Sequence, residues 1–205
     1  SGADLRYANL SNADLNGADL NAANLWGADM GGADLTIANL TNSILYSVKL
    51  DYADLSGAAL SGVDLRNADL IVANLTGADV KNADLRYADL NGADLSGADL
   101  SGADLSGSTV TENQFLSAHR VTGVTIQNHD MSGWNLIGVD LSGADLNGAD
   151  LSYANLRYAN LNYTDMSNAN LKDAYDLYDA YRSNAIWSNT ICPNGINSNY
   201  WGNTC

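Results

Sequence analysis

Aspartate is the residue through which this chain could most readily do chemistry. Glu112 is the single glutamate among the 24 acidic residues, and the other 23 are aspartates. Two neighbouring carboxylates could act as a general acid and a general base, and stacked carboxylates could bind a metal ion.

Most of these aspartates, however, occupy one position of a five-residue word, A-(D/N)-L-x-x. Between Ser1 and Val110, asparagine takes the same position in four words, at Asn9, Asn24, Asn39 and Asn74. A catalytic carboxylate or a metal ligand would not tolerate this exchange, whereas a turn-forming side chain would. We therefore predict no catalytic residue, no metal site and no cofactor.

The two histidines, His119 and His129, do not point to an active site either. The stretch HRVTGVTIQNH that joins them contains no nucleophile motif and no metal-ligand spacing. The chain also lacks a phosphate-binding loop and a dinucleotide-binding motif. Surface or packing roles are predicted for both histidines, and the protein is predicted not to be an enzyme.

The word that holds the aspartates repeats without a gap from Ser1 to Val110. Of these 22 words, 19 have Leu in the fifth position, 18 have Ala in the third, and 14 have Asp in the fourth. A period of five fits neither a helix nor an ordinary strand. Ala and Leu, two residues apart, share one side of a short extended piece, and the residues between words favour turns. The pattern predicts a coil with Leu and Ala inside.

This word, over residues 1–110 and 122–171, resembles that of the pentapeptide-repeat protein family. The resemblance implies an all-β fold, a right-handed quadrilateral β-helix (a solenoid) with four words per coil. About eight coils are expected if the interruption between the two runs replaces no word.

The interruption lies at about residues 111–121, and the leucine positions after it are shifted by one residue. Thr111 and Gln114 match a capping box, so residues 111–120 are predicted to form a short helix with Phe115, Ala118 and Val121 against the coil. The alternative is a one-residue bulge with the coil continuing.

The β-helix is predicted to occupy residues 1–171, followed by a C-terminal capping segment at 172–205. Continuation of the word would place Asp176 in the core, which is costly, and DAYDLYDAYR has a helical spacing of apolar residues. The tail resembles a C-terminal extension of many bacterial pentapeptide-repeat proteins. Trp187 and Trp201 are predicted to cover the last coil.

Cys192 and Cys205 are the two cysteines of the chain, separated by the turn-rich stretch PNGINSNYWGNT. A disulfide is predicted and two free thiols are the alternative, while a zinc site would lack ligands. A disulfide favours an exported protein, periplasmic, lumenal or extracellular, over a cytoplasmic one. The chain begins in mid-repeat at SGADL, for which removal of an upstream segment is one explanation.

In a coil of twenty residues, positions twenty apart stack in a column. One column of first positions, with Tyr7 and Tyr87 beside it, is aromatic and basic: Arg6, Trp26, Tyr46, Arg66 and Arg86. Arginine and aromatic residues are typical of interfaces, so this column is predicted to be an interaction face. The alternative is local pairing of arginine with aspartate, which contributes little stability. Arg157 would join this face if the interruption is inserted between words.

The net charge of −15 argues against direct binding to nucleic acid or to an anionic membrane, and no apolar run is long enough for membrane insertion. Two functions stay open. The first is a non-enzymatic scaffold, a rigid exported rod that binds a protein partner or another copy of itself. The second is an acidic mimic of DNA that binds DNA gyrase or another DNA-binding protein, as in quinolone-resistance members of the resembled family. Ice binding is disfavoured because the columns mix Ser, Asn, Gly and Arg.

Overall fold

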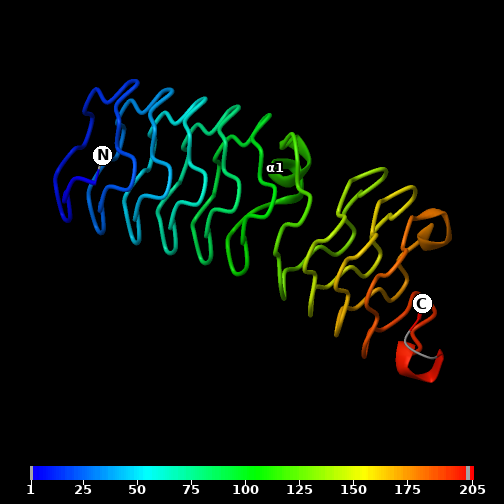
Figure 1. The fold of residues 1–205 in the computed structure, drawn as a ribbon. Coiled ribbons are helices and arrows are strands. Elements are labelled where there is room, and N and C mark those ends of the chain that lie inside the picture. Colours follow the sequence, from blue (N-terminus) through cyan, green and yellow to red (C-terminus); the bar gives the residue numbers. More distant parts are fainter. Residues whose placement is uncertain (1, 202–203) are drawn as a thin grey trace. The chain divides into compact units, whose positions relative to one another are not determined.

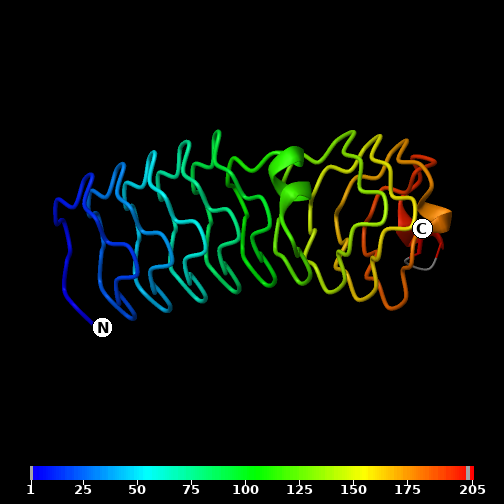
Figure 2. The same ribbon diagram turned by 90° about the horizontal axis from the view of Figure 1, so that it is seen from above.

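The computed structural model describes residues 2–201 and 204–205, which form two compact units, Ser1–Arg120 and Val121–Cys205. Each unit is a stack of coils (Figures 1 and 2). The helices are α1 (Glu112–Ser117) and two 3₁₀ turns, η1 (Leu177–Asp179) and η2 (Ser198–Trp201). The β-structure of the described residues consists of single-residue bridges between successive coils.

The word forms a coil because some of its positions point inward and another pairs with the next coil. The third and fifth side chains point inward, and the fourth residue pairs in parallel with the fourth residue twenty positions later, as Asp4 does with Asn24. The N–H of Asn24 donates to the Ala3 carbonyl at 2.8 Å, and the N–H of Leu5 donates to the Asn24 carbonyl at 2.8 Å. Since the pairs lie twenty residues apart, four words make one four-sided coil.

Aspartate and asparagine support the bend that follows each fifth residue. The Oδ1 atom of Asp34 accepts the N–H of Thr36 at 2.9 Å, and that of Asn24 accepts the N–H of Trp26 at 3.2 Å. Both residue types carry this acceptor oxygen, so either one can make the bond. The structure therefore explains why the two exchange freely.

The second residue of the word lies in the left-handed backbone region, as Tyr7 does at a φ of 58° and Gly27 at 64°. A large side chain there extends over the second residue of the next coil. A Cβ atom added to Gly27 would lie 2.8 Å from the Tyr7 ring. Glycine at position 27 thus allows the left-handed backbone there and leaves room for the Tyr7 ring.

Leucine and alanine fill the interior as predicted. Leu65 is fully buried and Leu95 is 1 % exposed, and the third-position alanines between them are also buried. Small third residues leave room for the leucines, so the core is built by the two inward positions of every word.

The helix α1 confirms the predicted capping box: Thr111 and Gln114 bond reciprocally, and Phe115 is buried. The Gln114 side-chain amide donates to the carbonyls of Leu90, at 2.6 Å, and Ala93, at 3.0 Å. The helix therefore takes the place of one side of a coil and does not project away from the coil.

One extra residue accompanies the helix, because Asp99 pairs with Arg120, 21 positions later. The two sequence alternatives, a helix or a one-residue bulge, thus both describe part of this segment. Among the described residues, the longest series of parallel bridges joins six residues in the first unit and four in the second. Within the first unit α1 occupies a coil side, and within the second unit the run extends beyond Leu171.

The second run continues for one coil beyond the expected end near Leu171. Bridges join Asn155 to Tyr175 and Asn170 to Ile191. The expected burial of Asp176 is avoided because this residue, at a φ of 57°, is an extra, exposed one, and Leu177 takes the inward place. The helical spacing of DAYDLYDAYR corresponds only to the three-residue turn η1.

The tail after this coil folds back along its edge. Ile191 pairs antiparallel with Asn197, and the Ser198 N–H donates to the Thr190 carbonyl at 2.8 Å. A disulfide joins Cys192 to Cys205. Trp187 is buried at a fifth position of the last coil. The side chain of Trp201 lies outside the described residues, so its predicted capping role stays a prediction.

Candidate interaction face

The predicted aromatic and basic column lies on one side of the first unit. Its residues hold first positions, and the column of fourth positions of the preceding words runs beside it: Asp4, Asn24, Ile44, Asp64, Asp84 and Asp104. The inward fifth residue between them turns both neighbours outward. The face therefore combines two columns, of which the sequence argument recognised one.

The N-terminal part of the face, which we call the aromatic half, consists of Tyr7, Trp26, Ile44 and Tyr46. The Tyr7 and Trp26 rings are 5.5 Å apart between centroids, and the Trp26 and Tyr46 rings are 6.3 Å apart and edge-on. Trp26 is 41 % exposed and Ile44 is 43 % exposed. Because Asn24 and Ile44 replace aspartate here, the two columns carry no charge between Arg6 and Asp64.

The C-terminal part, the charged half, consists of Asp64, Arg66, Asp84, Arg86 and Asp104. Arg66 donates two hydrogen bonds to Asp64, at 2.8 and 2.7 Å, and lies 3.4 Å from Asp84. Arg86 pairs in the same way with Asp84 and lies 3.5 Å from Asp104. The pairs form a ladder along the coils.

Hydrogen bonding from Arg66 holds the pKa of the Asp64 carboxyl below its usual value. Arg66 also links the two halves, because its guanidinium carbon lies 5.4 Å from the centre of the Tyr46 ring. The arginines thus pair locally with aspartate, as the alternative interpretation predicted, and the aromatic residues contact one another. The predicted role of the column as an interaction face stays a prediction.

Two of the remaining predicted residues, Arg6 and Tyr87, lie at the edges of the face. Arg6 donates two hydrogen bonds to Asp4, at 2.9 and 2.8 Å. Tyr87 is exposed and stands over Gly107, outside the aromatic half. Arg157 belongs to the second unit, where it lies 3.7 Å from Asp179. The structure brings together Tyr7, Trp26, Tyr46 and Arg66 in one continuous series of contacts.

Ile44 is the residue of the face that the sequence argument missed. It is one of four residues that break the Asp or Asn rule of the fourth position in the first run. Its neighbour Tyr46, two residues later, was already in the predicted column. An exception in the fourth position next to an aromatic first position was therefore the available signal.

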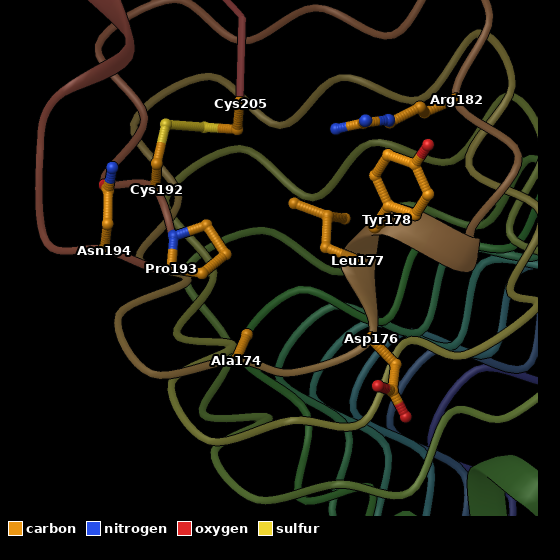
Figure 3. Close-up of a pocket in the computed structure, with 9 residues that line it drawn as sticks. All are labelled: Ala174, Asp176, Leu177, Tyr178, Arg182, Cys192, Pro193, Asn194 and Cys205. Carbon is orange, nitrogen blue, oxygen red and sulfur yellow. A yellow bond between two sulfur atoms is a disulfide. The ribbon is translucent and has the colours of Figure 1, made fainter.

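The second unit has a hollow of about 390 Å³ at its last coil (Figure 3). The Cys192–Cys205 disulfide, Leu177 and Pro193 form much of its wall, and Tyr178 and Arg182 stand at its side. Tyr178 is exposed, whereas Cys192 and Leu177 are buried. The sequence argument assigned no binding role to this region.

Within the described residues, no group of three or more His, Cys, Asp and Glu side chains is arranged to hold a metal ion. Their helices are also too short or too polar to span a bilayer.

Comparisons with known proteins identify the repeat. The family model described as pentapeptide repeats matches in eight copies, over residues 1–36, 32–67, 73–111, 122–152 and 135–173. No curated protein matches the chain.

The similar solved structures include two that cover most of this chain. One is HetL, a pentapeptide-repeat protein involved in heterocyst differentiation regulation in the cyanobacterium Nostoc sp. strain PCC 7120. HetL is 33 % identical to this chain, with a TM-score of 0.62, and the match covers 96 % of this chain and 86 % of HetL. A trypsin-treated form of QnrB1, a plasmid-mediated fluoroquinolone resistance protein, is 16 % identical, with a TM-score of 0.52 and coverage of 90 % and 91 %. The second likeness shows the fold alone.

These matches agree with the inward leucines, the twenty-residue ladders and the turn-forming aspartates. They confirm the predicted fold class, a right-handed quadrilateral β-helix. The chain belongs to the pentapeptide-repeat family.

Proposed function

We propose that this protein is a non-enzymatic scaffold that binds a protein partner through the aromatic half. The observation that carries the proposal is the contact series Tyr7–Trp26–Tyr46, with Ile44 in the neighbouring column. Exposed Trp and Tyr side chains each offer a large apolar area, and these residue types dominate binding energy at protein interfaces.

The charged half has a different role in this proposal. Arg66 and Arg86 already hold aspartate partners, so a second protein gains little from pairing with them. Their ordered charges instead favour one orientation of the partner over others. We expect affinity to depend on the aromatic half and orientation on the charged half.

The partner is proposed to be a neutral or basic protein rather than a second copy of this chain. The net charge of −15 causes two copies to repel each other. A partner with apolar side chains at its centre and lysine or arginine around them would complement the uncharged aromatic half and its acidic surroundings. The role of HetL in regulation supports binding as a use of this fold.

An exported location is part of the proposal and rests on the Cys192–Cys205 disulfide. Disulfides persist in oxidising compartments and are rare in the cytosol. Thiol titration of natively purified, unreduced protein tests this, since two titratable thiols would contradict export.

Photo-crosslinking tests the partner proposal. A benzophenone amino acid at position 26 is expected to crosslink a partner protein, and the same amino acid at position 76, in a different column, is not. For the purified partner, Trp26→Ala should weaken binding by at least about tenfold. Tyr52→Ala removes a 67 % exposed tyrosine outside the face and is the matched control. Equal losses in both variants, or crosslinks only between copies of this chain, would refute the proposal.

A second candidate function, mimicry of DNA, is favoured by one observation. A column on another side of the first unit stacks Asp14, Asp34 and Asp54 in successive coils. Carboxylates spaced about 4.8 Å apart form a line of negative charge comparable to a phosphate backbone. Inhibition of DNA gyrase supercoiling that is weakened in Asp34→Asn and unchanged in Trp26→Ala would favour mimicry over the scaffold.

A further inference from the structure

The hollow at the last coil of the second unit contains an unusual arginine. The Ala185 N–H donates to the Arg182 carbonyl at 3.3 Å, in the same pattern that joins Ala28 to the inward residue Leu25. Arg182 therefore holds a fifth position, which is apolar in every other word of residues 122–192. A cation has replaced the leucine of the repeat where the coil opens into the hollow.

Arg182 has no ion pair and no side-chain hydrogen bond within residues 2–201 and 204–205. The arginines at positions 6, 66, 86, 120 and 157, in contrast, each lie within 4.0 Å of an aspartate oxygen. Among the described residues of a chain with 24 acidic side chains, the half-buried Arg182 guanidinium thus has no carboxylate partner.

The aspartates nearest in sequence are directed elsewhere. Asp179 lies 3.7 Å from Arg157, and Asp176 contributes to raising the pKa of Arg157, behind the larger effect of Tyr158. Asp176 also points away from the other side chains that line the hollow (Figure 3). The Arg182 side chain extends toward the side of the hollow that holds Cys205 (Figure 3).

The wall opposite this cation is apolar except for Asn194, which lies beside Pro193 (Figure 3). Leu177, Pro193 and the Cys192–Cys205 disulfide line the hollow, whose volume of about 390 Å³ lies within the range of small-molecule sites. A guanidinium matches a carboxylate with two parallel hydrogen bonds. An apolar wall next to such a group suits a molecule with one charged end and a short hydrocarbon body.

We propose that this hollow binds a small organic carboxylate. Arg182 holds the carboxylate, and Leu177, Pro193 and the disulfide contact the hydrocarbon part. A monoanion fits better than a doubly charged phosphate, because the surrounding surface is acidic and repels the dianion more strongly. The site does not depend on the aromatic half of the first unit.

Nuclear magnetic resonance titration of the full chain with hexanoate tests the site. Hexanoate is expected to cause saturable shifts at the Tyr178 ring and at the Arg182 and Cys192 amides. Hexanamide has the same shape without the charge and should bind at least about tenfold more weakly. N-acetyl-leucine, which imitates a peptide C-terminus, serves as a second acid. Saturation by either acid supports the site. The acid that binds more tightly shows whether the natural carboxylate belongs to a free aliphatic acid or to a peptide C-terminus.

Arg182→Gln should weaken hexanoate binding by about tenfold or more, and Arg182→Lys should keep part of it because the charge stays. Arg120→Gln changes the net charge of the chain equally and is the control, with binding unchanged. Unaltered Trp187 signals show that each variant keeps the last coil folded. Absence of saturation by both acids, equal binding of hexanamide, or equal losses in Arg182→Gln and Arg120→Gln would overturn the proposal.

Discussion

Residues 21–105 of the first unit and residues 172–193 of the second unit follow the same five-residue word with different regularity. In the first region every fifth residue is Leu, Met or Val and is buried. In the second the fifth positions hold Leu177, Arg182, Trp187 and Cys192, and Asp176 is an extra residue.

The difference shows what a coil needs. An inner coil has a neighbour on both sides, so each inward side chain must fit two layers at once. The last coil has a coil on one side and a short tail on the other. Residues of other sizes, and a cation at the edge of a hollow, are therefore tolerated there as long as the bridges to the preceding coil form.

The largest expected difference between the two regions concerns the fifth position itself. Leu65→Ala should cost about 2–5 kcal/mol of unfolding free energy, because it leaves a cavity in a fully packed layer. Arg182→Ala, at the same position of the word, should cost less than about 0.5 kcal/mol. Urea unfolding of both variants provides the comparison. Similar costs would show that the last coil is packed like an inner one.

Reduction of the Cys192–Cys205 disulfide should act on the last coil alone. Opening a loop of about fourteen residues removes about 3 kcal/mol of stabilisation in the chain-entropy model. Hydrogen exchange should become faster at Thr190 and Ser198, whose backbones bond to each other, and stay unchanged at Leu65. Faster exchange throughout the first unit on reduction would contradict a local effect.

A glycine substitution can separate the cost of backbone conformation from that of coil-to-coil contact. Gly27 and Gly77 have nearly equal φ angles, 64° and 66°, but only an added Cβ at Gly27 would meet a ring, that of Tyr7. Both alanine variants should lose about 1–2 kcal/mol from the left-handed backbone, and Gly27→Ala should lose more.

The double variant Tyr7→Ala, Gly27→Ala provides the control for this contact. Without the ring, the effect of Gly27→Ala should fall to that of Gly77→Ala. If the effect does not fall, the Tyr7 side chain is not what restricts position 27. Steric contact would then not explain why a glycine follows a large second residue in the next coil.

The smallest expected effect is the pH dependence of the turn aspartates. Hydrogen bonds from the Thr36 hydroxyl and N–H hold the pKa of the Asp34 carboxyl below its usual value, which is about 3.9 in an unfolded chain. Its stabilising effect is therefore present above the unfolded pKa and is lost as the pH falls through the folded pKa. When the pH is lowered below about 4, the urea concentration at the unfolding midpoint of the wild type should decrease. The decrease should be slightly smaller in Asp34→Asn.

Asp94, whose pKa is lowered in the same way by Ser96, offers a second site for this measurement. A larger acid sensitivity in either asparagine variant than in the wild type would contradict the turn role. The two aspartates test the regular region only, since the last coil replaces the fourth-position aspartate by Tyr175, Tyr181, Ile186 and Ile191.

Much of the first unit could be predicted because its word is strict. The inward positions of Leu65 and Leu95, the capping box at Thr111 and the disulfide partners were all visible in residue types and spacing. The end of the second run was not. The end of the coil was predicted before position 176, because a regular word would have buried Asp176. In the structure Asp176 is an inserted residue, so the coil continues without burying it.

The candidate sites divide in the same way. The column from Arg6 to Arg86 followed from counting in twenties, but the uncharged gap around Ile44 needed the fourth-position column beside it. Arg182 stands after an insertion that changes the phase of the word, so no count along the sequence placed it at an inward position.

The sequence by itself determined that this protein is a coil of five-residue words with leucine and alanine inside, because these residues recur at the same two positions in nearly every word. The four sides of the coil came from the family resemblance and not from the period. The tertiary structure decided where the coil absorbs an extra residue, which arginines find an aspartate, and which side chains meet across coils. These outcomes depend on contacts between residues about twenty positions apart, where a shift of one residue changes every partner, as between Asp99 and Arg120.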